Sequence, residues 1–102
     1  MPTYISLVKY TEQGIRNIKD SPKRLDAAKK MLKEMGGEIK GFYLTMGEYD
    51  IVTICEAPDD EAMTRFFLAL GSLGNVRTST LRAFPEEEYR RIVAGLAKNR
   101  KK

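Results

Sequence analysis

Two β-rich segments, 38–46 and 49–56, follow one another in the middle of the chain with a short glycine-containing link between them. This spacing predicts an antiparallel hairpin in which Gly47 is free to adopt a positive φ. A further β-rich run precedes the hairpin at 3–10, and another follows it at 75–84. A central hairpin flanked by two outer strands leaves few sheet topologies open.

Each outer strand is joined to the hairpin by an amphipathic helical pattern. Ser21 and Pro22 are the N-cap and first-turn signals of a helix that ends at Gly36 and Gly37. A second helix is predicted over 58–70, with acidic residues in its first turn. The pattern therefore predicts a helix on each side of the hairpin.

A short helical turn and a C-terminal helix complete the predicted order. Thr11 can cap a brief helical turn over 11–18, and Pro85 with three glutamates begins a last helix. We therefore predict an α+β, ferredoxin-like βαββαβ fold with a C-terminal helix in addition. In this fold a four-stranded antiparallel sheet has its first and third strands in the centre and two helices on one face.

The composition fits one globular domain. The chain has 102 residues, of which 42% are hydrophobic and 31% charged. The net charge of +4 comes from the last five residues, because 14 basic residues remain before them against 14 acidic ones. We expect a domain at 1–97 and a solvated basic tail at 98–102, and we do not expect nucleic-acid binding.

The location of the protein is also predicted by what its sequence lacks. The first ten residues carry no signal-peptide pattern, and no apolar run approaches the about 20 residues of a membrane span. The single cysteine, Cys55, is interpreted as a small buried apolar residue in a strand. We expect a cytoplasmic protein that does not bind membranes.

The residue types that the chain lacks argue against several kinds of cofactor and catalytic site. The chain has no histidine and one cysteine, which leaves few ligands for zinc, an iron–sulfur cluster or a haem. The Ser and Cys triads that depend on histidine are missing, and no glycine-rich phosphate motif occurs. We therefore expect no metal and no organic cofactor.

Two sets of side chains alternate along the predicted strands. We expect one apolar set to face the helices: Ile5, Leu7, Phe42, Leu44, Val52 and Ile54. The other face would then carry Tyr4, Ser6, Val8, Tyr43, Thr45, Ile51, Thr53, Thr78 and Thr80. A face this rich in Tyr, Thr and Val suits a second sheet or a ligand better than water. We therefore expect a homo-oligomer that packs through its sheets.

Carboxylate, phenol and guanidinium groups remain as candidates for binding a polar ligand. They are Arg16, Asp20, Tyr43, Tyr49, Asp50, Arg77 and Arg82. For Tyr49 and Asp50 the alternative is a turn in which the aspartate bonds backbone amides. For the two strand arginines the alternative is a solvated edge.

RNA-recognition modules share this strand order and need a direct comparison. They carry stacking aromatics and a basic-glycine-aromatic octamer on the third strand. Here that strand contains Asp50 and Glu56 and lacks the octamer. The sequence therefore argues against RNA binding.

The segment Thr45–Val52, with its Gly47, Tyr49 and Asp50, resembles the motif that names the GYD domain family. Three further blocks, at 11–24, 56–60 and 73–78, also look like that family, so the resemblance covers nearly the whole chain. Glu48 stands between the glycine and the Tyr-Asp pair, which is a departure from the family name.

This resemblance implies a ferredoxin-like fold of the dimeric α/β-barrel type. It implies no activity, because the biochemical role of the family is unassigned. By position in the family it nominates five candidate residues: Arg16, Tyr49, Asp50, Asn75 and Arg77.

Three functions remain open. The first is a homo-oligomeric small-molecule-binding protein with a pocket between the helices and the Tyr/Thr sheet face, anchored by Arg16, Tyr49 and Asp50. The second is a cofactor-independent enzyme, similar to a monooxygenase or isomerase, with Asp50 or Asp20 as base and Tyr49 or Arg16 holding an oxyanion. The third is a structural or protein-interaction module in which Gly47, Tyr49 and Asp50 only shape a hairpin and a subunit contact.

Overall fold

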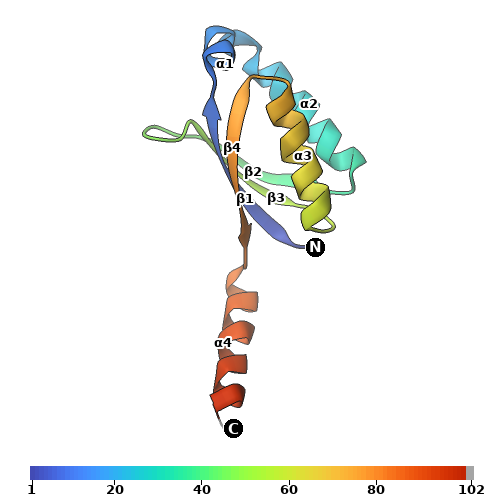
Figure 1. Cartoon of the computed structure of the whole chain (residues 1–102), viewed down its shortest axis with the longest axis vertical. Coiled ribbons are helices and arrows are strands. Elements are labelled where there is room, and N and C mark those ends of the chain that lie inside the picture. The colour runs from blue at the N-terminus through green and yellow to red at the C-terminus, as the bar shows by residue number, and fades with distance from the viewer. Residues whose placement is uncertain (101–102) are drawn as a thin grey trace.

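The computed structural model describes the backbone of residues 1–100 and the side chains of residues 1–96 (Figure 1). The last helix continues to Arg100, and Lys101 and Lys102 lie outside the described residues. The expected division into a domain at 1–97 and a basic tail at 98–102 therefore stays a prediction.

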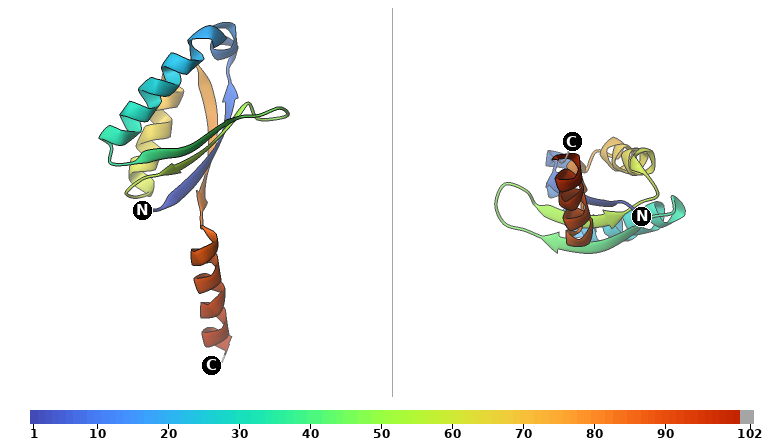
Figure 2. Two further views of the ribbon diagram at one scale, coloured as in Figure 1. Left: turned by 180° about the vertical axis from the view of Figure 1, so that it is seen from behind. Right: turned by 90° about the horizontal axis from the view of Figure 1, so that it is seen from below.

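The chain forms one four-stranded antiparallel sheet with the strand order β2-β3-β1-β4. The elements are β1 (Thr3–Tyr10), α1 (Glu12–Arg16), a 3-10 turn (Ile18–Asp20), α2 (Ser21–Glu34), β2 (Glu38–Leu44), β3 (Ile51–Glu56), α3 (Asp60–Ser72), β4 (Val76–Ala83) and α4 (Glu86–Arg100). Helices α2 and α3 cover one face of the sheet (Figures 1 and 2). The ferredoxin-like prediction, with β1 and β3 in the centre, is confirmed.

Helix caps explain where the helices start. The Thr11 hydroxyl accepts a hydrogen bond from the Gly14 N–H, and the Asp59 carboxylate accepts one from Ala62. Ser21 was expected as the N-cap of α2, but it is the first helical residue, and Asp20 occupies the cap. The 3-10 turn ends at Asp20, so the backbone is already helical when α2 begins.

The loop that joins β2 and β3 is longer than the sequence spacing predicted. Six residues, Thr45–Asp50, form the loop, and β2 and β3 are correspondingly shorter than the predicted runs. Gly47 has a φ of 104°, as expected for its position. The Asp50 carboxylate accepts a hydrogen bond of 2.9 Å from the backbone N–H of Tyr10, which fastens the loop to the end of β1. The two-residue turn was therefore a wrong prediction.

The two faces of the central strands are exchanged relative to our expectation. Tyr4, Ser6 and Val8 of β1 are buried beneath the helices, as are their β3 neighbours. Ile5, Leu7, Val52 and Ile54, which were expected under the helices, lie on the opposite face. Both sets contain enough apolar residues to form a core, so alternation alone could not decide which set the helices cover.

The hydrophobic core combines aromatic, aliphatic and sulfur-containing side chains from the sheet and the two covering helices. Its buried members are Tyr4, Ala28, Leu32, Cys55, Ala57, Met63 and Phe66. Leu32 of α2 and Met63 of α3 are 0% and 1% exposed. Each helix therefore places at least one fully buried side chain against the sheet.

The other face of the sheet is apolar and uncovered. In the centre, Ile5 and Leu7 of β1 lie beside Ile54 and Val52 of β3. At its margins Tyr43 and Leu81 are exposed by 58% and 47%. We call these six residues the open sheet face. An antiparallel sheet that faces water normally alternates to polar side chains, and the middle of this face does not. Polar side chains lie beside it, where Ser79 pairs with Leu7 and Arg77 pairs with Lys9.

Helix α4 leaves the far end of β4 and projects away from the rest of the domain (Figures 1 and 2). The molecule therefore measures 57 × 31 × 19 Å along its principal axes. Within the described residues, no helix has the length and apolar character needed to cross a membrane.

The buried Tyr4 predicts a stability change at alkaline pH. Burial, followed by the hydrogen bond from its hydroxyl to the Asp60 carboxylate, raises the pKa of Tyr4 to about 12. The folded protein holds this proton more tightly than the unfolded chain. The stabilisation is therefore complete below pH 10 and is lost as the pH rises towards 12.

Urea unfolding of the wild type and of Tyr4→Phe between pH 8 and 12 measures this effect. We expect the wild type to be more stable by about 1–3 kcal/mol at pH 8, because it retains the hydrogen bond to a charged group. The difference should shrink above pH 10. The exposed Tyr89 of α4 gives the control variant, Tyr89→Phe. A difference that stays constant with pH would contradict the prediction.

Candidate ligand-binding cavity

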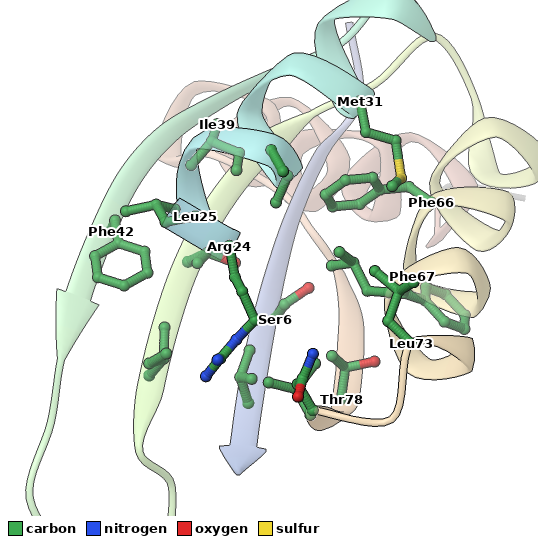
Figure 3. A pocket seen from close by; sticks show the side chains of 18 of the residues that line it. Ser6, Arg24, Leu25, Met31, Ile39, Phe42, Phe66, Phe67, Leu73 and Thr78 are labelled. Atoms are coloured by element: carbon green, nitrogen blue, oxygen red, sulfur yellow. The ribbon is translucent and has the colours of Figure 1, made fainter. Parts of the chain in front are cut away.

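A cavity of about 270 Å³ lies between the two covering helices and the sheet (Figure 3). Helix α2 contributes Leu25, Ala28 and Met31 to its wall, and α3 contributes Phe66, Phe67 and Leu70. Its volume lies near the lower end of the range typical of small-molecule sites. It lies between the helices and the Tyr/Thr face of the sheet, which is where the first of the three functions expects a pocket.

Short side chains on both walls leave this space open. Ala28 lies on the helix side, and Ser6 and Thr53 lie on the sheet side. The Ser6 hydroxyl is hydrogen-bonded to that of Thr80 at 2.8 Å, and Thr53 accepts a hydrogen bond from the Cys55 thiol at 3.7 Å. Because these polar atoms already have partners, the sheet wall offers a ligand mainly apolar contact.

One end of the cavity is apolar and deeply buried. Cys55 and Phe66 are 1% and 3% exposed, and Met31 and Ile39 pack against this part of the core. Burial raises the pKa of the Cys55 thiol, and the hydrogen bond with Thr53 lowers it only in part. The thiol is therefore protonated at neutral pH, which agrees with its interpretation as a small apolar residue.

The other end is polar, because it lies where β1 ends and where α2 and β4 begin. Tyr10 and Ser21 meet there, with their hydroxyl oxygens 3.3 Å apart. Asn75 and Thr78 contribute an amide and a hydroxyl to the lining. The Arg24 side chain reaches from α2 into this end (Figure 3). The cavity is thus amphipathic along its length.

Arg24 is held by backbone carbonyls. Its Nη1 donates to the carbonyl oxygen of Asn17 at 2.9 Å, and its Nη2 donates to that of Gly14 at 3.2 Å. A guanidinium has five N–H donors, so further donors remain for another acceptor. Among the described residues, Arg24 is the one charged side chain that lines the cavity. Its positive charge is oriented there with no carboxylate in the lining to neutralise it.

Of the eight residues that the sequence nominated, Asn75 lines the cavity. Arg16 is exposed and forms an ion pair of 3.0 Å with Glu12, one turn away. Asp20 is exposed at the start of α2, and Asp50 bonds the Tyr10 amide at the end of β1. For Asp50, this is the backbone-bonding alternative, although the amide is distant in sequence.

The remaining four predicted residues lie away from the cavity lining. Arg82 is exposed on β4, where its guanidinium lies 4.5 Å from the centroid of the Phe84 ring. Tyr43 is on the open sheet face, and Arg77 is exposed on the edge strand β4. Tyr49 is half-buried in the hairpin loop, where the Lys9 ammonium lies 5.5 Å from its ring centroid. The structure does not bring the predicted set together, and their part in ligand binding stays a prediction.

Sequence reasoning missed Arg24, although a signal was present. Arg24, Ala28 and Met31 are spaced i, i+4 and i+7, so they share one helix face. Ala28 and Met31 are apolar and face the core, so an arginine in line with them marks a charge at the margin of the core. Phe67, Thr78 and the other lining residues carry no such signal before the fold is known.

The fold and the cavity define a ferredoxin-like α+β protein with a space of small-molecule size beneath its helices. The family model described as GYD domain matches residues 4–93, and the chain belongs to the GYD domain family. The resemblance found in the sequence is confirmed.

One named relative comes from Thermus thermophilus, and one structure of similar fold comes from Mycobacterium tuberculosis. The chain is 35% identical over 86 residues to the "Glutamine synthetase and cystathionine beta-lyase binding protein" of Thermus thermophilus, covering 83% of this chain and 90% of that protein. The "Feast or famine regulatory protein" of Mycobacterium tuberculosis, complexed with L-methionine, superposes with a TM-score of 0.63 at 16% identity. The match covers 83% of this chain and 51% of that chain, so this chain spans about half its length.

A solved structure of a Thermus thermophilus protein is similar over nearly its whole length. It superposes with a TM-score of 0.54 at 25% identity, covering 83% of this chain and 95% of that chain. Together with the Mycobacterium tuberculosis structure it supports the ferredoxin-like fold.

Proposed function

We propose that this protein is a homo-oligomeric small-molecule-binding protein whose ligand occupies the cavity between α2, α3 and the sheet. The observation that carries the proposal is the oriented guanidinium of Arg24 at the polar end of a cavity whose other end is apolar. Structural cores are close-packed, and a charged group directed into a cavity is typical of a binding site.

The open sheet face supports the oligomeric part of the proposal. Its central side chains come from β1 and β3 and are apolar, and Tyr43 extends them at the margin. A contiguous apolar patch on a sheet typically marks a contact with another protein surface. A second copy brings the same patch, so two copies related by a twofold axis would cover both patches.

The cofactor-independent enzyme receives less support from this geometry. Such an enzyme was expected to use Asp20 or Asp50 as a base, and neither lines the cavity. Among the described lining residues there is no carboxylate that could take a proton from a bound substrate. The arrangement can bind and orient a molecule, which is the function proposed here.

Native mass spectrometry of the freshly purified protein tests the proposal, with Ala28→Leu as the diagnostic variant. We expect an oligomer that retains an organic molecule. Ala28→Leu should lower the retained fraction about tenfold or more, because three added carbons enter the cavity and overpacking costs about 1–3 kcal/mol.

The matched control is Ala94→Leu, which makes the same change on the exposed surface of α4. It should retain the ligand as the wild type does, and circular dichroism checks that both variants fold. Equal occupancy in the wild type and Ala28→Leu would place the ligand elsewhere. A protein that never carries a ligand from the cell or from an added metabolite mixture would contradict the proposal.

A protein-binding role is the second candidate, and α4 is the observation that favours it. Tyr89, Ile92, Val93 and Leu96 are spaced as one helical stripe and are 45–58% exposed. The Thermus thermophilus relative is named as a protein that binds two enzymes. An apolar stripe on a projecting helix would suit a partner that offers a hydrophobic groove.

A further inference from the structure

We propose that the ligand of the cavity is an organic monocarboxylate with an apolar alkyl or aryl body. Its carboxylate would be held by Arg24, and its body would lie towards Cys55 and Phe66. This inference rests on the proposed small-molecule function and names the chemistry of the molecule bound there.

The charge of the ligand follows from the polar end. Arg24 is fixed by two carbonyl oxygens and has no carboxylate partner in the described lining, so an anionic group would complete its hydrogen bonding. Helix α2 begins at Ser21, so the positive end of its dipole lies at the same end of the cavity. A cationic ligand would be repelled there. A neutral ligand would leave the charge of Arg24 without a counterion.

The polar neighbours of Arg24 suit a carboxylate. Asn75 and Thr78 line the same end and can donate through an amide and a hydroxyl. The Asn75 amide oxygen already accepts a hydrogen bond of 3.0 Å from the Gln13 side chain. That contact orients the Asn75 amide so that its NH₂ group is left to donate.

The size and polarity of the ligand body follow from the other end. A volume of about 270 Å³ corresponds to roughly nine water molecules at about 30 Å³ each, which suits on the order of ten non-hydrogen atoms. Met31 and Phe66 lie at this end, opposite the Arg24 guanidinium and Thr78 (Figure 3). The nearby sheet wall offers few polar partners, because the Ser6 hydroxyl is paired with that of Thr80 and Thr53 accepts from the Cys55 thiol, which leaves the Thr53 O–H as a donor. A ligand body with several polar groups would leave most of them without a partner at this end, which favours an apolar body.

The test uses octanoate and its neutral counterpart octanamide, which have the same number of non-hydrogen atoms. Calorimetric titration of the intact protein should show octanoate binding about 10- to 100-fold more tightly than octanamide, because a charge-assisted hydrogen bond is lost with the amide. Arg24→Gln should remove this preference by weakening octanoate and leaving octanamide unchanged. Arg65→Gln, on the exposed surface of α3, is the control and should bind as the wild type does.

The single cysteine reports where the probe binds. Cys55 lines the apolar end, so bound octanoate should slow its alkylation, and octanoate that binds without protecting Cys55 would overturn the proposed position. Equal affinities for octanoate and octanamide, or an equal loss of both in Arg24→Gln, would overturn the role of Arg24. If neither probe binds while native mass spectrometry shows another retained molecule, the ligand class is wrong and the proposed function stands. If neither probe binds and nothing is retained, both fail.

Discussion

Replacing Leu7 with lysine should convert the proposed oligomer into monomers. Leu7 lies in the middle of the open sheet face, on the central strand β1, and its cross-strand neighbour on β3 is Val52. In a twofold assembly each subunit would bury one new ammonium group against the partner's apolar sheet, and an unpaired buried charge costs several kcal/mol. The dissociation constant should rise more than about 100-fold.

Sedimentation velocity at several concentrations measures this change. Thr64→Lys introduces the same charge on the exposed surface of α3 and should leave the oligomer intact. Both variants should keep the wild-type circular dichroism spectrum, because the lysine can reach water in a monomer. A Leu7→Lys variant that remains oligomeric would show that the subunits associate through another surface.

A substitution in the exposed apolar stripe of α4 tests whether the subunits associate through this helix instead. Ile92→Lys places the same charge in the middle of the stripe, where Ile92 is 47% exposed. If α4 serves a different protein, Ile92→Lys should leave the oligomer unchanged. Dissociation of the oligomer in this variant would instead assign α4 to subunit contact, and the case for a separate protein-binding role would be lost.

Gly14→Ala should destabilise the fold by about 3 kcal/mol, which is large for the addition of one methyl group. Gly14 is buried in α1, and a Cβ at this position would lie 1.9 Å from the carbonyl oxygen of Asn75. That carbonyl cannot move freely, because it accepts a hydrogen bond of 3.1 Å from the backbone N–H of Thr11. Either α1 or the start of β4 would have to shift.

Denaturant unfolding at a fixed protein concentration measures the loss, with Gly71→Ala as the matched control. Gly71 lies in α3, and a Cβ there would meet no atom within 4 Å. Alanine is the better helix former, so this control should be unchanged or more stable by up to about 1 kcal/mol. Equal stability of the two variants would mean that α1 is not packed against the segment before β4. Because Gly14 also provides a carbonyl to Arg24, its substitution should weaken ligand binding too.

The position of the candidate site depended on a face assignment that the sequence pattern got wrong. Tyr4, Ser6 and Val8 were expected away from the helices, and the cavity lies beside this set because the helices cover that face. Of the nominated residues, Asn75 lies in the lining. Arg16 and Tyr49 drew attention because polar groups near a family motif are visible in sequence, yet Arg16 pairs with its own helix and Tyr49 stays in the hairpin loop. Arg24 was overlooked because a lysine- and arginine-rich helix offers many charges, and only packing shows which one turns inward.

The order of elements, the family and most helix boundaries follow from the sequence by itself. They depend on signals within a few residues, such as the caps at Thr11 and Asp59 and the positive φ at Gly47. The tertiary structure decided which side of β1 and β3 the helices cover, because both alternating sets are apolar enough to form a core. It also decided the cavity, since the space between Ala28, Ser6 and Thr53 exists only once distant segments pack together.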